Sequence, residues 1–284
     1  MPTGAQPDRR SRLARALLAA YGGYAMVAVI LLPMTAGDGL LVNAAVVVSA
    51  LGGVASLALS LRFGRPPTRR QVIALHVALV PIQFILSIPS SIVLLGMSIS
   101  AAVAVAMKPV LPRLKPAPRR FFLALHVGFS VAWLGLSLSM TALSLIGLSA
   151  DDPALRHHAY RVMHIFDLGV VIPIVLLSLL SGLVVALLTK WGLTRHWWVL
   201  SKFVIALSIP LAAGFAQERW ITELIERTAD PAVQPGGSGV RLVVCMVVYV
   251  VLLATATALS VYKPGGMTPW AKRKRAGVAA PAGQ

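Results

Sequence analysis

The sequence is poor in charge, and in negative charge above all. Charged residues make up 12% of its 284 positions, only nine residues are Asp or Glu, and 57% are hydrophobic. With a mean hydropathy of +0.81, the chain lacks the polar groups that would keep a domain of this size dissolved in water. The composition therefore excludes an ordinary soluble domain and indicates a polytopic membrane protein.

Cysteine and the common catalytic motifs are also scarce. The single cysteine, Cys245, lies in an apolar run, and one thiol cannot form an internal disulfide. The chain contains no phosphate-binding loop, no nucleophile motif and no metalloprotease motif. Whether the protein is an enzyme is therefore left open by its sequence.

The charges that are present follow a regular order. Most of the 26 Lys and Arg fall in five segments: the N-terminus, residues 62–70, 108–120 and 190–195, and the tail after Tyr262. The acidic residues, apart from Asp8, lie between these segments. Positive charge on alternate loops predicts a multi-pass protein of the cell membrane with both termini in the cytoplasm. The net charge of +17 then predicts contact with anionic lipid headgroups and not with nucleic acid.

The apolar runs predict an all-α fold of about eight transmembrane helices. A helical span needs ~20 apolar residues, and runs of that order lie at about 15–35, 39–61, 70–88, 91–107, 120–147, 162–188, 197–215 and 240–262. The third and fourth runs are separated at Pro89. One long helix there would place the basic segments 62–70 and 108–120 on opposite sides of the membrane.

The eight spans divide into two halves, each predicted to form a four-helix bundle. The halves cover 1–107 and 120–262, with a basic, Pro-rich linker at 108–119 and a disordered basic tail at 263–284. Weak similarity between the starts of the halves predicts an internal parallel repeat, with Tyr21 in the position of His126. The segment 217–239 is predicted to form a short interfacial helix followed by a flexible loop. The oligomeric state, including a homo-oligomer, is left open.

Four polar residues at one predicted depth form the first candidate site: Tyr21, His76, His126 and Lys202. Each lies one or two helical turns beyond a basic residue that marks the cytoplasmic boundary. A charged residue at the centre of a bilayer costs at least ~2.5 kcal/mol, so such groups usually face the interior of a helix bundle and have a partner there.

Each of these residues also has a structural interpretation. His76 and His126 can be neutral imidazoles that bond between helices, and Lys202 can extend its ammonium group to the membrane surface. Near the opposite boundary, His164 and Asp167 are three residues apart and share a helical face. They are therefore further candidates for polar groups inside the membrane.

The second half resembles a known group of bacterial membrane proteins. The resemblance rests on the segment around His126 and Trp133, on the run 172–182, and on the run that ends at Lys202. These segments resemble an uncharacterised branch of the four-helix proteins around the HemJ-type protoporphyrinogen oxidases and the CopD-type copper-resistance proteins, over about 119–262. The resemblance implies a bundle that binds haem b, with His126 as ligand of the iron and a functional role for Lys202. The stretch Leu-Ser-Leu-Ser-Met-Thr-Ala after Gly135 departs from the HemJ pattern and argues against protoporphyrinogen oxidation.

Three functions follow from these observations. The first is a redox or haem-handling protein that uses His126 and Lys202, with His76 or a group from another helix as a second cofactor ligand. The second is a small-molecule or ion permease whose polar path passes through Tyr21 and those three residues. The third is a membrane scaffold without catalytic activity, in which the same residues only bond between helices.

Overall fold

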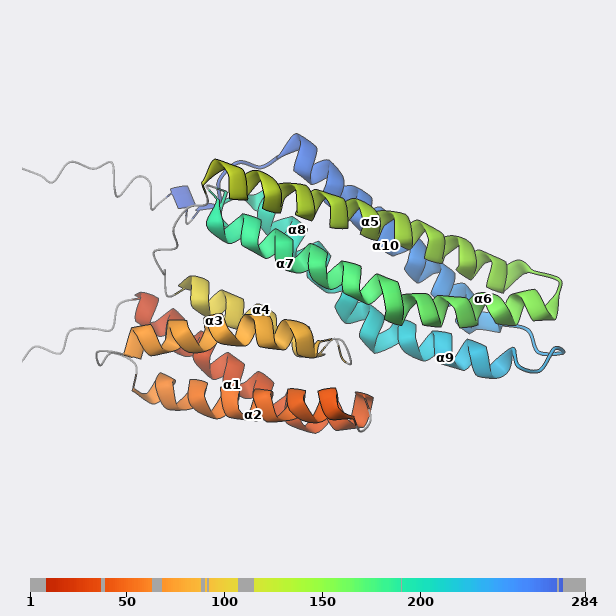
Figure 1. Cartoon of the computed structure of the whole chain (residues 1–284), viewed down its shortest axis with the longest axis horizontal. Helices are drawn as coiled ribbons and strands as arrows, with labels where there is room; N and C mark the ends of the chain where they lie inside the picture. Colours follow the sequence, from red (N-terminus) through yellow and green to blue (C-terminus); the bar gives the residue numbers. More distant parts are fainter. Residues whose placement is uncertain are drawn as a thin grey trace, which may run out of the picture. The chain divides into compact units, whose positions relative to one another are not determined.

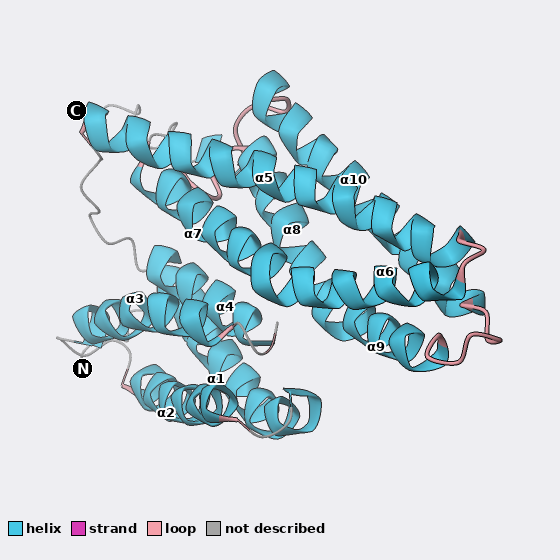
Figure 2. Ribbon diagram, turned by 45° about the vertical axis from the view of Figure 1, so that its right-hand side comes forward, coloured by secondary structure: helices cyan, strands magenta, loops and turns pink. Residues whose placement is uncertain are grey.

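The structure, a computed structural model, describes residues 9–36, 39–62, 68–87, 90, 92–106, 115–189, 191–269 and 271–272. Within these residues all regular structure is helical, which confirms the predicted all-α class (Figure 2). The chain divides into two compact units, Met1–Leu111 and Pro112–Gln284. The boundary between them falls in the Pro-rich segment 108–119, of which residues 108–114 lie outside the described part.

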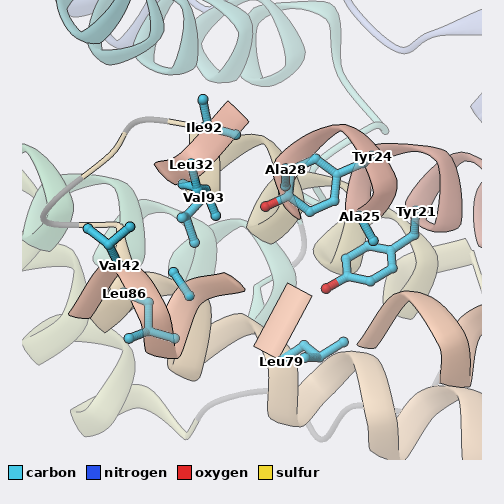
Figure 3. Close-up of a cluster of buried hydrophobic side chains, with 11 residues drawn as sticks. Tyr21, Tyr24, Ala25, Ala28, Leu32, Val42, Leu79, Leu86, Ile92 and Val93 are labelled. Atoms are coloured by element: carbon cyan, nitrogen blue, oxygen red, sulfur yellow. The ribbon is translucent and has the colours of Figure 1, made fainter. Parts of the chain in front are cut away.

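Unit 1 contains four helices that share one core: α1 (Arg9–Ala36), α2 (Leu40–Leu61), α3 (Thr68–Leu86) and α4 (Ile92–Ala106). α1 packs against α2 and α4, and α3 packs against the same two helices. Aliphatic side chains from all four helices form this core together with Tyr21 and Tyr24 (Figure 3). Pro89, at which the sequence predicts the break between α3 and α4, lies outside the described residues.

Small residues determine how closely the helices of unit 1 approach one another. An added Cβ at Gly53 of α2 would overlap the Cβ of Ala25 on α1, and one at Gly22 would lie 2.6 Å from the side chain of Leu57. Within a bilayer, lipid tails are as apolar as Leu, so helices associate through close van der Waals packing at such small residues. The interface between α1 and α2 therefore depends on the absence of these side-chain carbons.

Unit 2 is built from longer helices (Figure 1). The first, α5 (Pro116–Ser149), is unbroken. The second helical stretch starts as α6 (Pro153–Phe166), passes through a π-helical turn, η1 (Asp167–Val171), and continues as α7 (Ile172–Leu188). α5 packs along both α6 and α7.

The return half of unit 2 repeats this pattern. α8 (Trp197–Ala212) passes through a second π-helical turn, η2 (Ala213–Gln217), into α9 (Glu218–Arg227), and α10 (Gly236–Tyr262) follows. α10 packs against α5 and α8, so neighbouring helices have the same order as in unit 1. The predicted internal repeat stays a prediction.

The segment between α8 and α10 differs from its prediction. α9 continues α8 through η2, and its apolar residues Ile221 and Leu224 are fully buried, with α6 and α10 packed against the helix. The loop after α9 is held by buried Arg156, which donates to the carbonyl oxygen of Val233 at 3.3 Å. The prediction of an interfacial helix was wrong because an amphipathic pattern does not show whether lipid or protein covers the apolar face.

The start of the C-terminal tail is ordered, which corrects the prediction of disorder from residue 263. Thr268 is fully buried; its N–H donates to the carbonyl oxygen of Arg195 at 3.0 Å, and its hydroxyl donates to that of Thr194 at 2.9 Å. The acceptors of these bonds are backbone carbonyl groups, which every residue has. The amino-acid composition of the tail therefore gave no sign of them. Residues 273–284 lie outside the described part.

In the part of the chain that the structure describes, six helical segments are long and apolar enough to cross a membrane: 15–36, 40–61, 116–149, 153–188, 197–227 and 236–262. The helical parts 70–86 and 92–104 are apolar but shorter. A fifteen-residue helix such as α4 is ~22 Å long, against ~30 Å for the hydrocarbon core. A multi-pass membrane protein is therefore supported, and the count of eight depends on α3 and α4.

We predict that Gly53→Ala destabilises the protein by ~1–3 kcal/mol, because the new methyl group overlaps Ala25 on the facing helix. Gly23→Ala is the matched control, since no atom lies within 4 Å of its added Cβ, and it should be neutral or slightly stabilising. Thermal unfolding of the two purified variants in detergent checks this. Equal melting temperatures would contradict the tight packing of α1 on α2.

Candidate functional site

A chain of hydrogen bonds crosses the interior of unit 1 and includes a residue from every helix. Tyr21 Oη accepts from Gln83 Nε2 at 2.8 Å, and Gln83 Oε1 accepts from Ser100 Oγ at 3.1 Å. His76 lies between two hydroxyls, with Nδ1 3.3 Å from Ser100 Oγ and Nε2 3.3 Å from Ser56 Oγ. All five side chains are fully buried. The rings of Tyr21 and His76 are also in contact, with centroids 5.1 Å apart.

The direction of these bonds fixes the tautomer of His76. Ser100 donates its hydroxyl hydrogen to Gln83, so it accepts from His76, and Nδ1 carries the hydrogen. Nε2 then accepts from Ser56. Both ring nitrogens are used inside unit 1, and neither has a lone pair left for iron. A role for His76 as second haem ligand does not fit this geometry.

His126 of α5 packs against α7 in unit 2. Its Nδ1 is 3.1 Å from the carbonyl oxygen of Ser178 and 3.4 Å from Oγ of Ser181. The ring fits against Gly182, where an added Cβ would meet Cε1 at 2.8 Å. A carbonyl oxygen only accepts, so Nδ1 carries the hydrogen and Nε2 keeps its lone pair. His126 therefore has the tautomer in which a histidine binds metal through Nε2.

Lys202 and Trp133 lie in the same unit as His126. Lys202 is partly buried on α8, its Nζ is 5.8 Å from the centroid of the Trp198 ring, and it interacts electrostatically with His126. Trp133 is buried on α5. The predicted layer of four polar residues is thus divided into two pairs, one in each unit.

A hydrogen bond between two polar side chains joins the two π-helical turns of unit 2. Asp167 opens η1 and Gln217 closes η2, and Gln217 Nε2 donates to Oδ2 of Asp167 at 3.3 Å. Their exposed fractions are only 8% and 3%. In η1 the N–H of Ile172 donates to the carbonyl of Asp167, five residues back, and Glu218 donates likewise to Ala213 in η2. Such π turns are rare and occur frequently at functional sites.

Further titratable side chains surround the pair of Asp167 and its amide partner. His164, one turn before Asp167, places Nδ1 3.4 Å from Oε1 of Glu218 in the first turn of α9. Tyr249 of α10 is buried and interacts electrostatically with Asp167. Apart from a weak interaction with the thiol of Cys245, its hydroxyl has no hydrogen-bond partner among the described residues. The network around the buried carboxyl group is therefore incomplete, and an ionisable residue at such a place usually marks an ion or proton pathway.

Asp167 and Gln217 lie at matched depth because of where their helices begin and end. At 1.5 Å per residue, Asp167 is ~31 Å from Leu188 at the end of α7, and Gln217 is ~30 Å from Trp197 at the start of α8. Both distances equal the ~30 Å thickness of the hydrocarbon core. The pair therefore marks the end of the apolar spans opposite to His126.

Pro173 explains where the first π-helical turn forms. It follows η1 closely and lacks the N–H that would bond to the carbonyl oxygen of Gly169, within η1. Local π geometry accommodates a carbonyl group that loses its partner in this way. Gln217 was not among the candidates predicted from the sequence. The available signal was a polar amide at the end of an apolar run. It lies about as many residues from the basic segment 190–195 as Asp167 does.

Ser56 and Ser100 were also missed. Serine is ordinary in membrane helices, where its hydroxyl often bonds to its own backbone, as Ser98 does with the carbonyl oxygen of Leu94 at 2.8 Å. Only the rotational position of α4 decides that Ser100, and not Ser98, faces His76. Without the packing of the helices, no sequence signal separates the two.

Comparisons with known proteins give no information about the function of the site. No family model, no curated protein and no solved structure matches the chain. The resemblance of the second half to the HemJ-type and CopD-type proteins stays a prediction. Among the described residues, no three His, Cys, Asp or Glu side chains come together in a group that could hold a metal ion.

We predict that Ser100→Ala costs ~0.5–2 kcal/mol of stability, because His76 and Gln83 both lose a buried partner. Ser98→Ala, on the same helix, should cost almost nothing, since its hydroxyl bonds only within α4. Equilibrium unfolding of the purified variants in mixed micelles measures both changes. Equal free energies of unfolding for the two variants would show that the chain of hydrogen bonds does not contribute to stability.

Proposed function

We propose that this protein crosses the cell membrane eight times as two four-helix bundles, with both termini in the cytoplasm. Six segments are long enough by themselves, and α3 and α4 complete the count because they pack with α1 and α2 around one core. A short span is tolerated where the bilayer thins locally at a modest cost. Eight spans also keep the five basic segments on one side.

Within this topology, the geometry supports best a proton-translocating permease in which Asp167 takes up and releases the proton. The observation that carries this proposal is the hydrogen bond between Asp167 and Gln217 at two π-helical turns. A primary amide has both donors and an acceptor, so Gln217 can bond to the carboxylate and also to the carboxylic acid. The site therefore supports both protonation states of Asp167.

His164 and Glu218 provide the route between Asp167 and the far side of the membrane. Their side chains are 34% and 41% exposed, and they are 3.4 Å apart. An imidazole and a carboxylate that contact both water and each other can exchange protons with the solvent. Glu218 directly follows Gln217, so the exposed pair adjoins the buried one.

A polar face of α5 provides the route to the cytoplasmic side. Ser137 is buried on this face, and Ser130 Oγ is 3.1 Å from Ser178 Oγ, next to His126. His126, Ser130 and Ser137 follow one another at ~6 Å and ~11 Å along the helix, so the route requires water molecules between them. This path runs within unit 2 and does not use Tyr21 or the other residues of unit 1, unlike the permease predicted from the sequence.

We predict that Asp167→Asn reduces proton flux to the level of protein-free liposomes. Asparagine keeps the shape of the side chain and its bond to Gln217 but cannot carry a proton. Purified protein is placed in liposomes that contain a pH-sensitive dye, and a potassium diffusion potential, negative inside, drives protons inward. The rate of internal acidification is measured for the wild type and the variants.

Glu226→Gln is the matched control, because Glu226 is exposed on α9 and its loss should leave the flux unchanged. Asp167→Glu should retain part of the flux, since it keeps the titratable group. A wild-type rate no higher than that of protein-free liposomes would reject the permease. An unchanged rate in the Asn variant would reject Asp167 as the proton carrier.

Haem binding at His126 is a second candidate, favoured by the bond from Nδ1 to the carbonyl oxygen of Ser178. This bond orients the ring and leaves the lone pair of Nε2, with which His126 would hold the iron of a haem. Lys202 interacts electrostatically with His126. Its ammonium group could therefore pair with the acidic groups of a porphyrin held by His126. A bound haem would supply one-electron chemistry, and His126 would hold it.

For this candidate we predict a haem absorption band in protein purified from haem-replete cells, and its loss in His126→Ala. His158→Ala is the control, because that ring is exposed and bonds to its own helix at the carbonyl oxygen of Ala154. A wild type without the band, or a band that persists in His126→Ala, would exclude His126 as a haem ligand.

A further inference from the structure

Aromatic and basic side chains gather where the connection between α7 and α8 meets the end of α10. The indoles of Trp191 and Trp198 are in contact, with centroids 5.3 Å apart, and the ring of His196 touches both. Lys263 Nζ lies 5.5 Å from the centroid of Trp191, and Lys202 Nζ lies 5.8 Å from that of Trp198. We call these five residues the clasp.

The chain itself holds the clasp in place. Residues after Lys263 turn back onto the connection between α7 and α8: Met267 pairs with His196 as an isolated bridge, and Trp197 N–H donates to the carbonyl oxygen of Gly266 at 3.4 Å. Together with the buried Thr268, these contacts fix Lys263 relative to α8. The fold therefore fixes the backbone position of both lysines, of which Lys202 is partly buried and Lys263 is exposed.

Among the described residues, no carboxylate is paired with the positive charge of the clasp. Neither lysine forms an ion pair with a carboxylate among the described residues, in which only two ion pairs occur, both on the opposite side. The described acidic residues of unit 2 all lie at Asp167 and beyond it, towards that side: Asp151, Asp152, Asp167, Glu218, Glu223, Glu226 and Asp230. Tryptophan rings favour the headgroup level of a bilayer, where phosphate groups are the nearest anions.

The backbone at Lys263 provides an independent indication. This residue ends α10 in the left-handed conformation, with φ 49° and ψ 50°, and it is the only described residue other than glycine with positive φ. Glycine is the usual residue at this position of a helix end, because a side chain there is strained. Strain that persists at one residue suggests a functional reason for keeping its side chain.

We propose that the clasp binds the phosphate group of an anionic phospholipid in the cytoplasmic leaflet, with Lys202 and Lys263 as the charged contacts. The rings of Trp191 and Trp198 orient the two ammonium groups and lie against the glycerol and upper acyl region. Basic pockets between membrane helices on this side are suited to such headgroups. The proposal uses the topology proposed above but neither the proton path nor haem.

The test compares full-length protein in nanodiscs of phosphatidylcholine with the same protein in nanodiscs that also contain phosphatidylglycerol. The anionic lipid should raise the melting temperature of the wild type by several degrees, because a ligand bound only to the folded state stabilises it. Lys202→Gln and Lys263→Gly should lose most of this increase. Lys263→Gly has a second signature: in pure phosphatidylcholine it should melt at or above the wild-type temperature, since glycine removes the strain.

Lys115→Gln is the matched control, because Lys115 is an exposed charge on the same side that lies outside the clasp. It should keep the full increase. If all three variants lose the same part of the increase in melting temperature, the effect comes from general surface charge and the proposal is overturned. The proposal is also overturned if Lys202→Gln and Lys263→Gly keep the full increase. A matching increase when inorganic phosphate is added to pure phosphatidylcholine nanodiscs would instead assign the clasp to a soluble phosphate ligand.

Discussion

The structure depends on one constraint, that a polar group surrounded by hydrocarbon must find its partner within the protein. The backbone meets this requirement by forming helices in every described segment that is long and apolar enough to cross a membrane. In unit 1, the chain from Tyr21 to Ser56 gives each of its members a partner, whereas the hydroxyl groups of Tyr24 and Ser49 have none among the described residues apart from a weak interaction with each other. In unit 2 the same constraint is met only partly around Asp167, because the hydroxyl of Tyr249 lacks a full hydrogen bond. We attribute function to the arrangement around Asp167 because it leaves room for a change of protonation, whereas the chain from Tyr21 to Ser56 is complete.

Much of the fold was predictable because the bilayer imposes a length and a charge order on the sequence. The predicted runs end at the same residue as the helix where a basic segment follows, as for α2 at Leu61 and α7 at Leu188, whereas α7 begins ten residues later than predicted. The prediction was poorest beyond the membrane, where length is no longer constrained. There α9 proved to be an extension of α8, and hydrogen bonds from Thr268 to backbone atoms fixed the start of the tail. Neither feature has a compositional signature.

The residues of the candidate sites that are rare in membrane helices could be predicted from the sequence, and the residues that are common there could not. Histidine, lysine and aspartate are conspicuous in an apolar run, so His76, His126, Lys202 and Asp167 could be identified one by one. Their partners are a serine, a backbone carbonyl and an amide, which are ordinary in membrane helices. Whether such a residue faces a partner depends on the rotation of each helix about its axis, and packing at residues such as Gly53 and Gly182 sets that rotation. The sequence therefore predicted candidates but not their pairing.

The two π-helical turns of unit 2 also affect the phase of the helices that contain them. A π turn holds one more residue than an α turn, and each added residue turns the rest of the helix by ~100° about its axis. Without η1 and η2, the apolar faces of α6 and α9 would be rotated away from the interior that buries Tyr160 and Leu224. Because both helices carry one insertion, their extensions stay in phase with each other. The packing of α6 and α9 in unit 2 thus depends on one additional residue in each of the two π-helical turns.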